Sequence, residues 1–198
     1  MAFPAAHATV LFMKLRASFN NRIVAALFPI LLGLIAGPAF AAGLDELFEK
    51  LQTAEPREAQ RLERQIWREW SKSGSAAMDL LLQRGRDAME AGETEAAIEH
   101  FTALIDHAPD FAEGWNARAT AYYQLGLFGP SVSDIQHVLA LNPRHFGALS
   151  GFARILEDTG KPDRALQIYL AALAIHPTLQ GIKEAVERLQ TKAAGQEM

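Results

Sequence analysis

The segment ALNPRHFGALSG, residues 140–151, combines residue types that a reactive or anion-binding loop would need. Arg144 and His145 could hold a phosphate or move a proton. Gly147 and Gly151 could let the backbone approach a bound ligand closely. The segment also has a proline between two apolar stretches, which is typical of a joint between two helices. The elements around it decide between these interpretations.

Two other short motifs could carry chemistry. Asp158-Thr159-Gly160 matches the triplet of aspartic proteases, which need two carboxylates brought together on a β-rich scaffold. Gly160-Lys161 could end a phosphate loop, but Ile155 stands where the first glycine of such a loop belongs. Neither match is favoured, because the glycine also fits a periodic turn position described below.

The histidines beyond residue 41 lack the spacing of a metal site. No two of them are four residues apart, as a zinc-binding pair on one helix face would be. The chain has no cysteine, which excludes disulfides, thiolate metal sites and cysteine nucleophiles. We expect no catalytic residue, no metal and no cofactor, and mostly solvated histidines. The residues in question are His100, His107, His137, His145 and His176.

The first 41 residues differ in composition from the rest of the chain. They contain basic but no acidic residues, the apolar run IVAALFPILLGLIAG (23–37) and then an A-F-A triplet. This pattern predicts a secretory signal peptide over 1–41, cleaved after Ala41. The alternative is an uncleaved anchor, because 23–43 is nearly long enough to span a bilayer. Either Met1 or Met13 could be the start.

Cleavage would leave an acidic chain. Three of the 19 basic residues lie in the first 41, which leaves 16 against 23 acidic residues, a formal charge of −7. Nucleic acid and an anionic membrane surface are therefore not expected as partners. The predicted location is the periplasm, reached by the general secretory route. With an uncleaved signal, the chain would be anchored in the inner membrane.

A period of 34 residues runs through the chain between residues 78 and 179. Several columns of positions keep one kind of residue at this spacing, which predicts a repeat protein. The columns include Pro109/Pro143/Pro177, Gly92/Gly126/Gly160, Gly85/Ala119/Ala153, Leu81/Trp115/Leu149 and Ile98/Val132/Leu166.

Each repeat predicts a pair of helices. Apolar residues recur at three- and four-residue steps, which is the pattern of an amphipathic helix. The glycine column can adopt the left-handed conformation that ends the first helix, and the proline column stops the second. The column of small residues lets the two helices approach closely. Helices of about 14 residues are marginal alone, so neighbouring repeats must bury their apolar faces against each other.

These columns resemble three tetratricopeptide repeats, at 78–111, 112–145 and 146–179. The resemblance implies an all-α fold, a right-handed superhelical solenoid of helix–turn–helix repeats with capping helices. The chain is similar to small exported tetratricopeptide proteins of Gram-negative bacteria. In the best copy, WNARATAYYQLG…P, the family's marked positions hold Trp115, Ala119, Tyr122, Gly126 and Pro143.

The flanks predict caps for these repeats. Residues 42–75 read as a degenerate N-terminal helical pair that acts as a cap, in which Trp67 and Trp70 pack under copy one. Residues 180–198 read as a C-terminal capping helix and tail, with apolar residues on one face under a charged one.

The resemblance also implies a concave groove, lined by the first helix of each repeat, that binds peptides or extended chain segments. Arginine and asparagine in it could hydrogen-bond a ligand's main chain or carboxylate, and tyrosine and methionine could supply apolar contact. Candidate residues are Arg86, Met89, Asn116, Thr120, Tyr123, Gln124, Gly147, Ser150 and Arg154, with Leu82 and Glu157 on the same face.

The chain lacks the Lys/Asn/Lys/Arg clamp with which some family members bind the C-terminal carboxylate of chaperone tails. We therefore expect a non-catalytic interaction module or scaffold, exported, with a protein or peptide partner in the groove. Alternatives are a self-associating structural protein of the envelope and a membrane-anchored adaptor. The positions that correspond to the clamp hold Leu82, Arg86, Ala117, Gly147 and Gly151.

Overall fold

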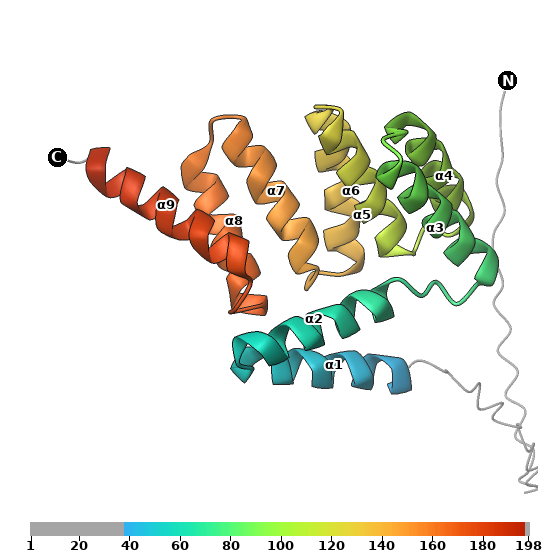
Figure 1. Cartoon of the computed structure of the whole chain (residues 1–198), viewed down its shortest axis with the longest axis horizontal. Coiled ribbons are helices and arrows are strands. Elements are labelled where there is room, and N and C mark those ends of the chain that lie inside the picture. The colour runs from blue at the N-terminus through green and yellow to red at the C-terminus, as the bar shows by residue number, and fades with distance from the viewer. Residues whose placement is uncertain (1–37, 197–198) are drawn as a thin grey trace, which may run out of the picture. The chain divides into compact units, whose positions relative to one another are not determined.

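The computed structural model describes residues 38–196, and these residues form helices joined by short turns, with no strand among them (Figure 1). The all-α prediction is confirmed. No helix in this part of the chain is long and apolar enough to cross a membrane. The helices are α1 (Pro38–Thr53), α2 (Pro56–Trp70), α3 (Ala76–Glu90), α4 (Thr94–His107), α5 (Ala112–Gln124), α6 (Phe128–Leu141), α7 (Phe146–Asp158), α8 (Pro162–Ile175) and α9 (Gln180–Gln196).

The predicted signal peptide, 1–41, lies outside the described residues except for 38–41, which begin α1. Its cleavage stays a prediction.

Three helix pairs form the repeats: α3 with α4, α5 with α6, and α7 with α8 (Figure 1). Each pair also packs on the next, and α9 packs on α8. The first helices α3, α5 and α7 contact one another directly, so they share one face of the stack. This arrangement confirms the helical solenoid that the 34-residue period predicts.

The glycine column and the proline column end the helices as predicted. Gly92, Gly126 and Gly160 have φ angles of 78°, 71° and 73°, a region that favours glycine because it has no Cβ. The residues before the column prolines have φ between −131° and −139°. Proline disfavours the helical conformation in the residue before it, so the second helix of each repeat stops there.

The small-residue column has a direct packing reason. A Cβ on Gly85 of α3 would lie 2.2 Å from the ring of Phe101 in α4, so only glycine fits. Phe101 is 1% exposed and lies in an apolar cluster that includes Leu82 and Leu104. Leu82 is therefore a core residue, and its assignment to the groove face was wrong.

Trp115 marks the start of copy two but is only half buried. Its Nε1 donates a hydrogen bond to the carbonyl oxygen of Pro109 at 2.8 Å, and its ring stacks on His137 at 4.2 Å. The tryptophan thus braces the turn between two repeats at the surface of the stack.

The N-terminal pair, α1 and α2, packs on copy three. Trp67 and Trp70 contact the ring of Phe146, with centroids 5.7 and 5.0 Å away, so the prediction that they pack under copy one was wrong. Gln52 of α1 also donates to the carbonyl oxygen of Ile175 at the end of α8, at 2.8 Å.

We expect Phe101→Ala to lower the free energy of unfolding by about 3–5 kcal/mol, because it removes a buried ring whose cavity Gly85 cannot fill. Urea denaturation followed by ellipticity at 222 nm measures this. Leu170→Ala is the matched control, since Leu170 is 44% exposed on α8, and we expect it to change stability by less than about 0.5 kcal/mol. A loss below about 1 kcal/mol for Phe101→Ala would contradict the packing of α3 on α4.

Candidate binding groove

Hollows lie along the face that the first helices share. The central hollow, between α5 and α7, has a volume of about 130 Å³. A second hollow lies between α3 and α5, and a third between α7 and α9. The central hollow is lined by Asn116, Ala119, Thr120, Tyr123, Ser131, Ile135, Gly147, Ala148, Gly151, Arg154 and Ile155.

All nine groove residues predicted from the sequence line one of these three hollows, so the structure brings them to one face. Each of Asn116, Thr120 and Arg154 borders two hollows, which makes the three continuous. The α3–α5 hollow has Arg86, Met89, Asn116, Thr120 and Gln124; the central hollow has Asn116, Thr120, Tyr123, Gly147 and Arg154; the α7–α9 hollow has Ser150 and Arg154.

Six of the nine already donate side-chain hydrogen bonds inside the chain: Arg86, Asn116, Thr120, Tyr123, Ser150 and Arg154. Arg86 Nη2 donates to Glu113 Oε1 at 2.6 Å and to Ser71 Oγ at 3.2 Å. Ser150 Oγ donates to the carbonyl oxygen of Phe146 at 2.7 Å. The first role of Arg86 and Ser150 is therefore structural, which their sequence positions did not indicate.

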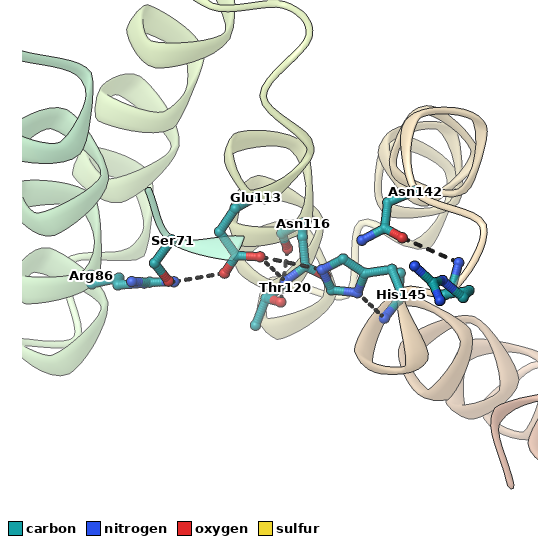
Figure 2. A network of polar contacts seen from close by, with 9 residues as sticks. Ser71, Arg86, Glu113, Asn116, Thr120, Asn142 and His145 are labelled. Carbon is teal, nitrogen blue, oxygen red and sulfur yellow. Dashed lines mark hydrogen bonds and ion pairs between the residues drawn. The ribbon is translucent and has the colours of Figure 1, made fainter. Parts of the chain in front are cut away.

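Glu113 organises a buried polar network at one edge of the groove (Figure 2). Its side chain is 3% exposed and accepts hydrogen bonds from Arg86 of α3, from Asn116 of its own helix and from His145 beside α7. A buried carboxylate is stable only when such donors replace water. No repeat column or motif marked Glu113, because its partners lie 27 and 32 residues away.

Two histidines are buried, so the expectation of mostly solvated histidines was wrong for them. His145 is fully buried, and its Nδ1 accepts from the backbone N–H of Ala148 at 3.0 Å. That acceptor role places the ring proton on Nε2, 3.3 Å from Glu113 Oε2. His176 lies with Nε2 3.3 Å from Glu63 Oε2, and this hydrogen bond lowers the pKa of Glu63.

Both side chains of the Arg144–His145 pair contact the N-terminal helices. Trp70 of α2 stacks on the His145 ring, with centroids 4.2 Å apart and planes at 16°. Arg144 lies over the ring of Phe48 at 4.3 Å and pairs with Asp45 at 2.5 Å. The pair therefore connects the turn before α7 with the N-terminal helices.

The two glycines of α7 have opposite surroundings. A Cβ on Gly147 would lie 2.6 Å from the indole of Trp67, so that glycine admits the tryptophan. A Cβ on Gly151 would meet only Ile135, at an ordinary 3.9 Å, among the described residues. Of the space that the two glycines leave beside α7, the part at Gly147 is filled by Trp67 of α2 and the part at Gly151 stays open.

A tyrosine and an ion pair form the rim of the central hollow. Tyr123 donates a hydrogen bond to the carboxylate of Asp158 at 2.7 Å, which raises the pKa of the Tyr123 hydroxyl. Arg154 Nε contacts the same carboxylate at 3.3 Å, and its side chain is 59% exposed. Asp158, the carboxylate of the protease-like triplet, thus belongs to the rim. No cluster of three metal-ligating side chains occurs in residues 38–196.

Paired helices in register and hollows along their first helices define a helical-repeat protein. A tetratricopeptide repeat model matches residues 82–129 and 131–179. A TPR repeat-containing protein of Rhizobium etli is 40% identical over 153 residues, 77% of this chain and 75% of that protein. The chain belongs to the tetratricopeptide repeat family.

Other matches cover a smaller share of this chain. The small glutamine-rich tetratricopeptide repeat-containing protein 2 of Saccharomyces cerevisiae is 31% identical over 60% of this chain, which spans 34% of that protein. The first tetratricopeptide domain of Spaghetti (RPAP3), bound to the HSP90 peptide SRMEEVD, superposes with a TM-score of 0.56 at 23% identity, over 59% of this chain and 93% of that one. The Sgt2 domain from Aspergillus fumigatus gives 0.58 at 21% identity, over 62% and 83%. At this identity the two structures show the fold alone.

We expect Gly147→Ala and Gly151→Ala to change stability in opposite directions. The first forces Trp67 out of its place and lowers the free energy of unfolding by about 1–2 kcal/mol. The second removes a flexible residue from mid-helix without a clash and raises it by about 0.5–1 kcal/mol. Urea denaturation of the two variants beside wild type measures both changes.

Trp67→Ala combined with Gly147→Ala is the control, because the alanine then has no indole to displace. If Gly147→Ala destabilises the Trp67→Ala background as much as wild type, the indole is not the cause.

Proposed function

We propose that this chain is a non-catalytic adaptor that binds an extended segment of a partner protein along the first-helix face. Tetratricopeptide domains mediate protein–protein interactions, and the related domain named above is bound to a peptide. The observation that supports the proposal is the continuous row of three hollows from α3 to α9. A peptide in extended conformation could fill such a row with alternate side chains.

The face is held in shape before any partner arrives. The Glu113 network connects α3, α5 and the start of α7, and Trp67 and Trp70 cover one end of it. A groove that is already ordered loses little conformational entropy when it binds, so its contacts contribute more fully to affinity. This favours recognition by a preformed surface over folding on binding.

The partner is not proposed to be a chaperone tail. The positions that correspond to the carboxylate clamp hold no lysine, and Arg86, their one basic residue, is engaged by Glu113. The partner's main chain and side chains, rather than its terminal carboxylate, would supply most of the contacts.

We also propose that the adaptor works outside the cytoplasm. The support is compositional: a basic start, an apolar run and an A-F-A triplet within the first 41 residues. Cleavage after Ala41 would leave a chain that begins AGLDEL. The N-terminal pair contributes to the stack through residues beyond that point, including Phe48, Leu51 and Leu62.

To test the groove, Thr120→Trp places a bulky side chain where the central and α3–α5 hollows meet, since Thr120 is exposed there. We expect partners crosslinked to wild type in the native host to be recovered at about a tenth of the wild-type level or less. Gln136→Trp is the matched control, because Gln136 is exposed on α6, a second helix. Equal recovery by both variants would show that partners bind elsewhere.

To test export, the chain is expressed in a Gram-negative host and the periplasmic fraction is analysed by N-terminal sequencing. We expect a product that begins AGLDEL. Substitution of Ala39 and Ala41 by arginine should leave the precursor uncleaved, because the peptidase site needs small residues. A full-length product confined to the cytoplasm would contradict the proposal.

A further inference from the structure

Gly151 lies in the middle of α7, where glycine is the least favourable residue apart from proline. Two other helical glycines make room for a neighbour, Gly85 for Phe101 and Gly147 for Trp67, whereas Gly129 and Gly181 lie in the first turns of α6 and α9, where a Cβ would meet nothing within 4 Å among the described residues. Gly151 has no such neighbour among the described residues, since a Cβ there would make only an ordinary contact with Ile135. What it leaves instead is space, at the base of the central hollow.

The central hollow has the size and lining of a pocket for one aliphatic side chain. Its volume is about 130 Å³, slightly less than an engineered apolar cavity of about 150 Å³ that binds benzene. The apolar part of the lining comes from three helices, with Ala119 from α5, Ile135 from α6, and Ala148 and Ile155 from α7.

The rim of this hollow carries an arginine, Arg154, which is paired with Asp158. Of the eleven described residues that line it, Arg154 is the only charged one. It gives one of its five N–H donors to Asp158, whose carboxylate also accepts from Tyr123. The guanidinium lies at the border with the α7–α9 hollow and is more than half exposed. It can therefore pair with an acidic group next to the side chain that enters the hollow.

We propose that the central hollow is the specificity pocket of the adaptor. It receives the aliphatic side chain of an extended partner segment, and an adjacent aspartate or glutamate of that segment pairs with Arg154. Asn116 and Thr120, on the opposite rim, border the path of the partner's main chain. This inference rests on the proposed function and narrows it to partners with an aliphatic–acidic pair.

The test starts from a displayed library of random 12-residue peptides, selected on the purified wild-type protein. We expect the selected sequences to share Leu, Ile, Val or Met beside Asp or Glu. Affinities of two such peptides, fluorescein-labelled, are then measured by polarisation on three variants. Gly151→Leu fills the hollow, Arg154→Gln removes the charge, and Gln136→Leu adds the same leucine on the outer face.

Gly151→Leu should raise Kd at least about tenfold, and Gln136→Leu less than about twofold. Arg154→Gln should raise it about fivefold for the acidic peptide and leave it unchanged when the acid is replaced by its amide. Circular dichroism checks that Gly151→Leu is folded. If it is not, Gly151→Ala replaces it, with an expected rise of about threefold.

The pocket is wrong if the peptides bind Gly151→Leu, or folded Gly151→Ala, as tightly as wild type. If they then lose affinity for Thr120→Trp, the groove still stands and only the pocket fails. The role of Arg154 is wrong if Arg154→Gln binds the acidic peptide as tightly as wild type does, just as it binds the amide peptide. No enrichment on wild type over Thr120→Trp overturns both the pocket and the proposed function.

Discussion

One buried carboxylate holds the groove together. Glu113 lies at the start of α5 with 3% of its side chain exposed, and its oxygens are reached by Arg86, Asn116 and His145. A charge in such a place is tolerated only while its donors stay in position, because removing one leaves the charge under-solvated. These donors come from α3, α5 and the residue before α7, so the carboxylate links the first helices of the three repeats, and Trp70 covers the site by stacking on His145.

The N-terminal pair covers this network and also shapes the binding face. By placing Trp67 against Gly147, α2 occupies one part of the space that small residues in α7 open, and Gly151 keeps the rest open. Two glycines four residues apart thus serve different ends, one to admit the chain's own side chain and one to leave a hollow. The distinction depends on which neighbour approaches each backbone position.

Much of the fold and of the candidate site was predictable because a repeat copies its geometry. Once the 34-residue period is seen, the left-handed glycines and the proline stops follow from single residues, and all nine groove residues fall on one face. The period could not reveal that Arg86 pairs with Glu113, or that Leu82, which was assigned to the same face, lies in the core. These outcomes depend on partners outside the repeat column.

The sequence by itself determined the family, the helix pairs and their turns, because each depends on local patterns: amphipathic spacing, a glycine that ends a helix and a proline that stops one. Only the tertiary structure decided that ALNPRHFGALSG connects the turn before α7 with the N-terminal helices. His145 is buried under Trp70, and Arg144 lies over Phe48. Those contacts join residues about 75 and 96 positions apart and follow no period. Their free energy comes from burying aromatic faces and satisfying a carboxylate, which only the folded chain brings together.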